Sequence, residues 1–267
     1  MTTPARATHH WSDVAGAYAD TFAHYCAGTI PLLLERARLL PGATALEVGA
    51  GTGLLSARIV ETDARLTATE PDPGMLAAAR QVLPAETRLV RAGLPRLPFA
   101  TGLFDVVVAN FVVNHVDDPR AGVSELARVT RPARQVLFTV WPSGTTSQGQ
   151  LFARVLDASG VTPPPADLLP PHLDFERTRD GVAALATGAG LEAVSVVEVP
   201  ISWRIRPDHF WRGISAGIGV IGRALQAQPE AVRTRLRASY DDLSRDLLDG
   251  DDLVFSATAL LAEGVTP

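Results

Sequence analysis

A glycine-rich turn that follows a short apolar strand is the feature that most constrains how this chain folds. Residues 44–53 read Thr-Ala-Leu-Glu-Val-Gly-Ala-Gly-Thr-Gly, so glycines stand at Gly49, Gly51 and Gly53, and an acid, Glu47, lies two residues before the first of them. Glycine reaches positive φ at little steric cost and lets a ligand approach the backbone closely. A helix that starts after the turn presents unpaired N–H groups and the positive end of its dipole. The pattern predicts a strand–turn–helix unit that brings the backbone against a ligand.

Short apolar strands alternate with helical patterns through the first half of the chain. Expected strands cover 43–48, 65–70, 87–91, 104–109 and 134–141, and expected helices cover about 53–61, 72–83 and 119–130. The run Val106-Val107-Val108-Ala109 indicates a strand that is buried on both faces. Two helices begin with an aspartate before a proline, Asp72-Pro73 and Asp118-Pro119, which suits an N-cap and a first helical position. Alternating β and α units predict a doubly wound, mostly parallel sheet.

We expect one domain over residues 1–267, with an α/β fold built on a Rossmann-like, mostly parallel seven-stranded sheet that carries helical cap or insertion segments. Its expected parts are two N-terminal helices within 1–40 that break near Thr29, a ligand-binding core over 41–141, and a C-terminal half over 142–267. In that half we expect cap segments at about 145–190 and 207–248, the latter broken near Pro229, and strands at 192–202 and 253–261.

Composition excludes several classes of protein. The net charge of −5 argues against a nucleic-acid scaffold, which usually carries a basic face. All 24 basic residues are arginine, so no lysine exists for a P-loop or for a Schiff base. The single cysteine, Cys26, precludes a Cys-rich metal site, and the acidic cluster within 241–252 has no EF-hand spacing, so we expect no metal. We expect neither a signal peptide nor a membrane helix, and therefore a cytoplasmic protein without a membrane partner.

The residues that end each parallel strand are the candidates for ligand contacts, because ligands of such sheets bind outside the carboxyl ends of the strands. The second strand ends at Glu70, which lies 17 residues after Gly53. In dinucleotide-binding folds an acid about 20 residues after the glycine turn binds ribose hydroxyls. We therefore expect Glu70 to bind a ribose, the alternative being that it merely precedes a turn. His115 follows the fourth strand and is the candidate general base; alternatively, it only shapes the site.

The motifs resemble those of a known family. The spacing G-x-G-x-G with Glu47 before it resembles motif I of class I S-adenosylmethionine (AdoMet) methyltransferases. The turn Leu97-Pro98-Phe99, the pair Phe104-Asp105 and the segment from Asn110 to Val116 follow in the order of the UbiE-like, small-molecule type. The resemblance runs from about Trp11 to Trp141, and its motifs are specific together although each is weak alone.

The resemblance implies a cofactor, a product and a reaction. The cofactor would be S-adenosyl-L-methionine, the product S-adenosyl-L-homocysteine, and the reaction methyl transfer to oxygen, nitrogen or carbon of a small molecule. The implied cofactor contacts are Tyr18, Glu47, Gly49, Ala50, Gly51, Gly53, Glu70, Pro71, Met75, Gly93, Leu94, Asn110 and Phe111. Gly93 departs from the pattern of the family, because many relatives carry an acid in the loop after the third strand, where this chain has this glycine.

An apolar acceptor pocket is expected from the aromatic residues of the C-terminal half. The candidates are Trp141, Trp203, Phe210 and Trp211, with Arg204, Arg206 and Arg212 nearby to hold an anionic group. The alternative is that the aromatic residues are core and the arginines are solvated. The segment Asn110-Phe111-Val112-Val113 differs from the Asn/Asp-Pro-Pro-aromatic segment of base-methylating enzymes, so no nucleic-acid partner is expected.

Three other functions stay open. One is an enzyme that uses the sulfonium charge of AdoMet for a reaction other than methyl transfer. A non-catalytic AdoMet-binding protein would keep the glycine turn and Glu70 without turnover. An NAD(P)-dependent oxidoreductase is disfavoured, because the glycine spacing is not G-x-G-x-x-G and the chain has no lysine for a Tyr/Lys pair.

Overall fold

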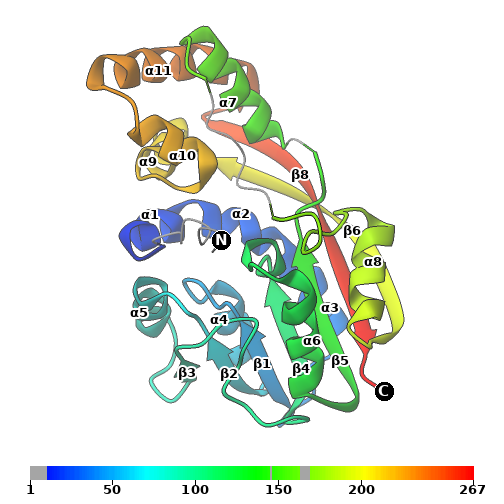
Figure 1. Cartoon of the computed structure of the whole chain (residues 1–267). Coiled ribbons are helices and arrows are strands. Elements are labelled where there is room, and N and C mark those ends of the chain that lie inside the picture. The colour runs from blue at the N-terminus through cyan, green and yellow to red at the C-terminus, as the bar shows by residue number, and fades with distance from the viewer. Residues whose placement is uncertain (1–10, 145, 163–168) are drawn as a thin grey trace, which may run out of the picture.

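The computed structural model describes residues 11–144, 146–162 and 169–267, which form one sheet with helices on both faces and further helices beyond one edge (Figure 1). In chain order the strands of these ranges are β1 (Thr44–Val48), β2 (Arg65–Thr69), β3 (Arg88–Val90), β4 (Phe104–Asn110), β5 (Thr130–Val140), β6 (Glu192–Ile205), β7 (Leu248–Asp249) and β8 (Asp252–Val265). Their order in the sheet is β3-β2-β1-β4-β5-β8-β6, with β7 beside β8.

The sheet is mostly parallel. Strands β3, β2, β1, β4 and β5 run in one direction, whereas β8 lies antiparallel between β5 and β6. The predicted α/β fold with a Rossmann-like sheet is thereby confirmed. The two-residue strand β7 is an addition to the seven predicted strands, and it is too short to leave a pattern in the sequence.

The helices of the described ranges are α1 (Ala15–Asp20), α2 (Phe22–Cys26), α3 (Ile30–Ala37), α4 (Leu54–Val60), α5 (Pro73–Val82), α6 (Pro119–Val129), α7 (Ser147–Ala158), α8 (Arg179–Gly188), α9 (Pro207–Ser215), α10 (Gly219–Gln226) and α11 (Glu230–Leu243). Four 3₁₀ turns accompany them, η1 (Trp11–Val14), η2 (Ala27–Thr29), η3 (Val113–His115) and η4 (Ser244–Leu247). Both aspartate–proline starts behave as expected, since Asp72 and Asp118 accept backbone N–H bonds as N-caps.

Two helix breaks differ from the prediction. A 3₁₀ turn ends at the predicted break, Thr29, but a further break lies at Thr21, where φ is −133° and ψ is −89°. The segment 207–248 holds three α-helices instead of two, because the chain turns at Gly217 with a φ of +101°. Within the described part of the chain, every helix is too short or too polar to span a lipid bilayer.

The side chains of the central strands alternate between two apolar layers, as the two-residue period of a strand requires. Leu46 and Val107 pack with buried residues of α6 and α8 on one face. Ala45 and Val108 pack with buried residues of α3 and α4 on the other face. Because helices cover both faces, the carboxyl edge of the strands is the part of the sheet that remains for a ligand.

Strands β6 and β8 continue past that carboxyl edge. Strand β8 pairs with β5 only over 260–265, but it pairs with β6 from Leu253 onward. The two-stranded extension, residues 199–205 and 253–259, reaches the helices α7, α9, α10 and α11, which together we call the cap (Figure 1). Helix α8 packs on β6 and α6, so only the α7 part of the segment 145–190 belongs to the cap. Helices α1 and α2 lie between the cap and the sheet (Figure 1).

Candidate functional site

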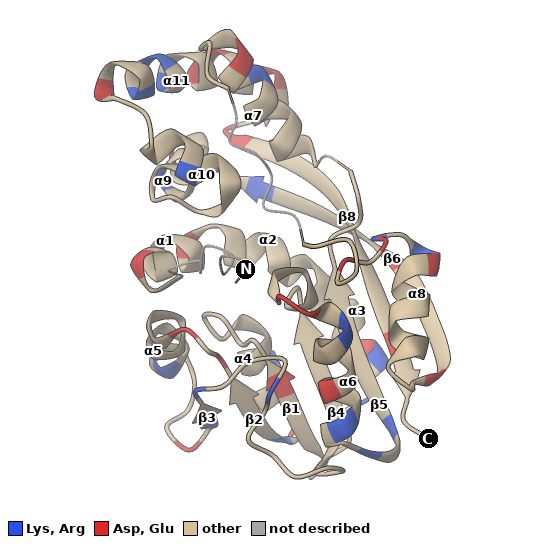
Figure 2. Cartoon of the chain, viewed as in Figure 1, with Lys and Arg blue, Asp and Glu red and all other residues tan. Residues whose placement is uncertain are grey.

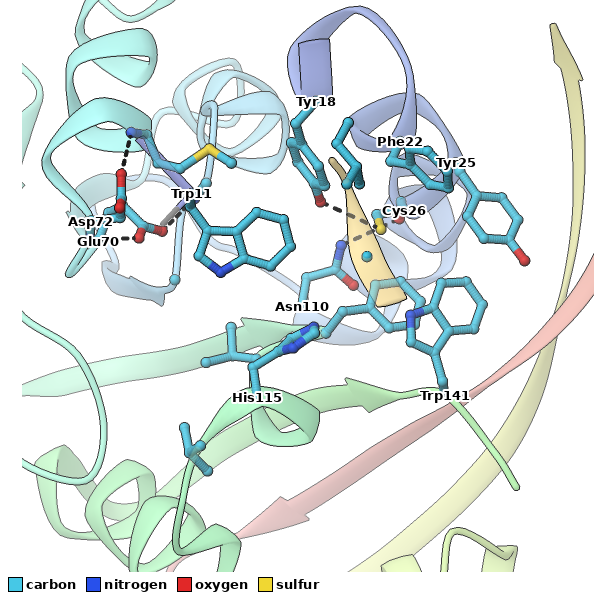
Figure 3. Close-up of a pocket in the computed structure, with 18 of the residues that line it drawn as sticks. Trp11, Tyr18, Phe22, Tyr25, Cys26, Glu70, Asp72, Asn110, His115 and Trp141 are labelled. Carbon is cyan, nitrogen blue, oxygen red and sulfur yellow. Dashed lines mark hydrogen bonds between the residues drawn. The ribbon is translucent and has the colours of Figure 1, made fainter. Parts of the chain in front are cut away.

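A cavity of about 920 Å³ opens at the carboxyl edge of the sheet, between the strand ends and the cap. One part, the glycine end, is lined by the 49–51 turn, the residues from Glu70 to Met75 and the loop after β3. The other part, the aromatic end, is lined by residues of α2, α7, α9 and α10 together with Trp141. Figure 3 shows Glu70 and Asp72 toward one side of the cavity, Tyr25 and Trp141 toward the other, and Asn110 and His115 between them.

The glycine turn is held against the neighbouring strand by backbone hydrogen bonds. The N–H groups of Gly49 and Ala50 both donate to the carbonyl oxygen of Thr69, at 2.8 and 2.9 Å. Gly51 has a φ of +55°, and a Cβ on it would have no atom within 4 Å. The turn therefore presents bare backbone to open space, as a close ligand approach requires.

Glu70 connects the glycine turn to the next loop. Its Oε2 accepts from the Gly51 N–H at 2.8 Å, and its Oε1 accepts from the Asp72 N–H at 3.0 Å. The side chain lines the cavity although the residue is only 7% exposed. Burial raises the pKa of Glu70 above its ordinary value, and the two backbone donors partly offset this. Each carboxylate oxygen keeps a lone pair for a ligand hydroxyl.

Glu47, the acid of the glycine motif, does not line the cavity. It is 2% exposed and accepts a hydrogen bond from the Ser56 hydroxyl of α4, so it ties the strand to the helix that follows the turn. The pKa of Glu47 is raised to about 7, mainly by burial. The hydrogen bond from Ser56 opposes this rise, and the charge of Glu70 adds to it. Its role in this structure is to position the turn.

The N-terminal segment covers the glycine end. The Ser12 N–H and hydroxyl donate to the two carboxylate oxygens of Asp72, at 3.0 and 2.7 Å, and the Gly74 N–H donates to the Ser12 hydroxyl. Beside this contact the Trp11 ring meets the rings of Tyr18 and His115 edge-on, with centroids 5.5 and 5.9 Å away. The segment thus reaches from the start of α5 across to η3.

The end of β4 forms the middle of the cavity. The Asn110 Oδ1 accepts from the Thr29 and Thr139 hydroxyls at 2.8 and 2.6 Å. Its Nδ2 donates to the Cys26 carbonyl (Figure 3). The Asn110 side chain is thereby fixed. Phe111 has a φ of +57°, and its N–H donates to the Thr139 hydroxyl at 2.8 Å. A non-glycine residue in this backbone region costs about 1–3 kcal/mol, and such residues concentrate at functional sites.

Stacked rings build the wall of the aromatic end. Trp141 lies between Phe111 and Tyr25, with centroid distances of 4.1 and 4.9 Å and interplanar angles of 14° and 15°. Tyr25 continues the series to Trp203, which packs edge-on against Phe210. Because both faces of the Trp141 ring are covered, this wall is a rigid part of the cavity.

Two of the four predicted pocket aromatics do not line the cavity. Trp141 and Phe210 line it, whereas Trp203 lies behind Phe210 and Tyr25 as part of the apolar core. Trp211 lies against Tyr240, with the Arg237 guanidinium 5.3 Å from its ring centroid. An aromatic residue type alone does not tell which side of a wall it occupies.

The arginines predicted to hold an anion do not line the cavity. Arg204 pairs with Asp249 at 2.6 Å, and Arg206 pairs with Asp251 at 2.8 Å, all four side chains being about half or more exposed. Arg212 is absent from the cavity lining as well. In Figure 2, basic residues (blue) and acidic residues (red) are likewise mixed along α11. Helix α2 carries neither Lys, Arg, Asp nor Glu.

Most of the predicted contacts meet at one cavity. The lining includes His115 and ten of the predicted cofactor contacts, Tyr18, Gly49, Gly51, Glu70, Pro71, Met75, Gly93, Leu94, Asn110 and Phe111. Glu47, Ala50 and Gly53 lie outside it. A Cβ on Gly53 would lie 3.3 Å from Ala79, so this glycine allows α5 to pack against the turn instead of contacting a ligand.

Several lining residues were not predicted. They include Trp11, Phe22, Tyr25, Cys26, Asp72, Gln148 and the stretch 218–221. The sequence holds a signal for two of them, since Tyr18, Phe22 and Tyr25 recur at the helical intervals of four and three, although the break at Thr21 divides them between α1 and α2. Gln148 and the 218–221 stretch leave no such signal, because only the tertiary fold brings them to the sheet edge.

The strand order, the glycine turn and the acidic end of β2 define a doubly wound α/β protein with a ligand site at the carboxyl edge of its sheet. Residues 46–138 match the family model described as "Methyltransferase domain". The uncharacterized protein Mb1440c of Mycobacterium bovis is 32% identical over 208 residues, which is 71% of this chain and 73% of that protein. On this similarity the chain belongs to the methyltransferase-domain family, as the sequence motifs predict.

Other comparisons agree with this membership. A demethylmenaquinone methyltransferase of Mycolicibacterium vanbaalenii is 35% identical over 121 residues, 45% of this chain and 50% of that protein. The chain spans about two fifths of the length of two further curated relatives, both uncharacterized methyltransferases. The fold matches a solved Thermotoga maritima structure described as a SAM-dependent methyltransferase, possible histamine N-methyltransferase, with a TM-score of 0.56 and 15% identity over 97% of this chain and 99% of that one.

Proposed function

We propose that this protein transfers a methyl group from AdoMet to a small-molecule acceptor, with the cofactor at the glycine end of the cavity and the acceptor at the aromatic end. The observation that carries the proposal is the buried Glu70 carboxylate, which lines the cavity and is tied to the Gly51 N–H. Small-molecule pockets typically measure roughly 300–1,000 Å³. A cavity of about 920 Å³ suits a cofactor and a small acceptor together.

The residues of the glycine end fit AdoMet. Glu70 offers a lone pair on each oxygen to the vicinal hydroxyls of a ribose, while Pro71 and Met75 offer apolar surface to an adenine. Gly51 leaves open the space that a side chain would fill. When bound, AdoMet supplies an activated methyl group on a sulfonium centre. The contribution of this chain is to hold that group and the acceptor atom close together in a site shielded from water.

The middle of the cavity is kept neutral. The Tyr18 hydroxyl donates to the Cys26 sulfur at 3.6 Å. Burial raises the pKa of Cys26 to about 11 and raises the pKa of Tyr18 well above its ordinary value, so neither group is an anion at neutral pH. His115 lines the same part of the cavity and is our candidate for removing a proton from an acceptor hydroxyl or carbon acid.

A comparison of cofactors tests the proposal and separates it from the alternatives. Calorimetry with AdoMet, S-adenosylhomocysteine and NADH should show binding of the first two only. Binding of NADH alone would favour an oxidoreductase. Release of S-adenosylhomocysteine with an acceptor panel distinguishes an enzyme from a non-catalytic binding protein. In the same assay, replacement of His115 by alanine should slow turnover more than it weakens AdoMet binding, and unchanged turnover would leave His115 a structural role.

A further inference from the structure

Among the residues that the structure describes, the charged ones that line the cavity are all confined to one side of it. They are Glu70, Asp72, Arg91 and Asp117, and they come from the end of β2, the start of α5 and the loops after β3 and β4. The lining residues from α2, α7, α9 and α10 include none with a formal charge. A charged group buried there would have no opposite charge beside it, and burial of an unpaired charge is costly. The aromatic end therefore favours an uncharged occupant.

One polar side chain of the aromatic end lacks a complete set of partners. Gln148, in the first turn of α7, is only 8% exposed and lines the cavity. Its Oε1 accepts from the Tyr25 hydroxyl at 3.4 Å, whereas its Nε2 has no partner within the described residues. Ser215 Oγ is the only polar side-chain atom of the described residues that is both sealed and without a partner. The Gln148 amide nitrogen is therefore accessible, and the residue that carries it lines the cavity. An accessible amide nitrogen without a protein partner can donate to a ligand oxygen.

The start of α7 adds a second attraction for an oxygen atom. Thr146, Gln148 and Gly149 all line the cavity, and they are the N-cap and first-turn residues of a helix of 12 residues. The Thr146 hydroxyl accepts from the Gly149 N–H at 3.3 Å, so it is already used as a cap. The positive end of a helix dipole favours electron-rich atoms. Because none of the described residues that line the aromatic end is basic, this helix start suits the partial charge of a carbonyl or hydroxyl oxygen instead of a full anion.

We infer that the methyl acceptor is an uncharged, largely apolar molecule with a hydrogen-bond-accepting oxygen, and that Gln148 selects it by donating to that oxygen. The inference rests on the proposed function, since it assigns the acceptor to the aromatic end. Gln148 acts as a specificity residue, because a site built to hydrogen-bond one group discriminates strongly against analogues that lack it.

Three probes of nearly equal shape test the inference. They are 2-acetylnaphthalene (an uncharged ketone), 2-isopropylnaphthalene (no oxygen) and 2-naphthoate (a carboxylate), each measured by equilibrium dialysis against the protein saturated with S-adenosylhomocysteine. The ketone should bind, and the carboxylate should bind at least about tenfold more weakly than the ketone. Equal or tighter binding of the carboxylate, or no binding of the ketone, would overturn the inference.

The matched variants are Gln148→Met and Gln150→Met. Gln150 is exposed on the same helix and does not line the cavity. Gln148→Met should weaken ketone binding about tenfold and leave hydrocarbon binding within about twofold, while Gln150→Met should change neither. If both variants behave alike, Gln148 is not a specificity residue. Gln148→Asn, which withdraws the amide but stays polar, should weaken ketone binding in the same way and serves if the methionine variant does not fold.

A measurement of cofactor binding distinguishes failure of the proposed function from failure of the inference about the acceptor. Calorimetry with S-adenosylhomocysteine is run on each preparation. If S-adenosylhomocysteine binds and 2-acetylnaphthalene does not, the inference about the acceptor fails and the proposed function stands. If the wild-type protein binds no S-adenosylhomocysteine, the proposed function fails and the inference fails with it.

Discussion

The two ends of the cavity are built by different means. At the glycine end the contacts are mainly backbone N–H groups and one carboxylate, and they come from a short stretch of chain between Gly49 and Met75 with the loop at Gly93. At the aromatic end the contacts are side chains that come from α2, from Trp141, and from cap helices as far along the chain as Ile221. The first end depends on local geometry, whereas the second depends on the packing of distant segments.

This difference predicts which end tolerates change. A turn fixed by backbone hydrogen bonds has few substitutions that keep its shape. A wall of apolar side chains accepts volume-conserving replacements more readily. The glycine end is therefore suited to a ligand of fixed structure, and the aromatic end to ligands that differ among related proteins. A substitution at one end should therefore leave ligand binding at the other end unchanged.

The largest expected effect breaks the glycine end alone. Gly51 has a φ of +55° and open space where a side chain would project, so Gly51→Val should place a branched side chain in the cofactor space. We expect AdoMet affinity to fall at least about 100-fold, equivalent to about 3 kcal/mol. Calorimetry measures the change. The affinity of 2-acetylnaphthalene should stay within about twofold, because the aromatic end is untouched.

Gly42→Val is the matched control for backbone strain. Gly42 also has a positive φ, of +77°, with no atom within 4 Å of a Cβ, but it is exposed and lies outside the cavity. Both variants should lose about 1–2 kcal/mol of stability. If Gly42→Val weakens AdoMet binding as much as Gly51→Val does, strain rather than the cofactor space explains the loss.

The second prediction concerns the stability of the glycine end. The pKa of Glu47 is raised to about 7 by burial, from an ordinary value of 4.5, so between these pH values the folded state binds more protons than the unfolded state. The free energy of unfolding should therefore fall as the pH rises from about 4.5 to about 7, by about 3 kcal/mol from this group. Glu47→Gln does not titrate and should lack that loss, which urea unfolding at several pH values would measure.

Glu61→Gln provides the comparison for this experiment. Glu61 is exposed at the end of α4 and pairs only with Arg58 across the helix surface. Its replacement removes one exposed carboxylate and should change the free energy of unfolding by no more than about 0.5 kcal/mol. A Glu47→Gln protein that loses stability between pH 4.5 and pH 7 as steeply as wild type would show that Glu47 is not the group responsible.

The same contrast explains how much the sequence could predict. The glycine turn, the strand that precedes it and Glu70 at the end of β2 belong to one local unit, so residue types and spacing predicted their meeting in space. Asp72 and Asp118 were likewise predicted as N-caps, because capping depends on neighbours along the chain. Glu47 shows the limit of this reasoning, since the motif predicts an acid at the ligand and the fold directs it to Ser56.

The aromatic end was predicted less well because its contacts are not local. The extension of β6 and β8 beyond the sheet decides whether Trp203 faces the cavity or the core. The strand pattern of the sequence did not predict the full length of this extension. Gln148 is an ordinary polar residue in the sequence, and only its burial beside Tyr25 distinguishes it. The breaks at Thr21 and Gly217, which shape α2 and α10, were not predicted either, although a glycine such as Gly217 is a local signal for a helix break.

The third prediction sharpens the division between the two ends. Glu70→Ala removes the carboxylate and leaves the Gly51 and Asp72 N–H groups without their acceptor. AdoMet affinity should fall by about 1–3 kcal/mol. The affinity of 2-acetylnaphthalene should not change. Glu86→Gln, at an exposed position outside the cavity, is the control. An unchanged AdoMet dissociation constant in Glu70→Ala would remove Glu70 from the cofactor site.

The smallest expected effect concerns the segment that covers the glycine end. Ser12→Ala removes the hydroxyl that donates to Asp72 and accepts from Gly74, but it keeps the backbone bond from Ser12 to Asp72. The loss of about 0.5–1 kcal/mol of exposed hydrogen bonding should speed the dissociation of S-adenosylhomocysteine about two- to fivefold in stopped-flow measurements. Gly74→Ala should act in the same direction by another route, because its Cβ would lie 2.5 Å from the Ser12 Cα. Ser143→Ala, at an exposed position outside the cavity lining, should have no effect. Unchanged dissociation in both Ser12→Ala and Gly74→Ala would mean that the N-terminal segment covers the glycine end without retaining its ligand.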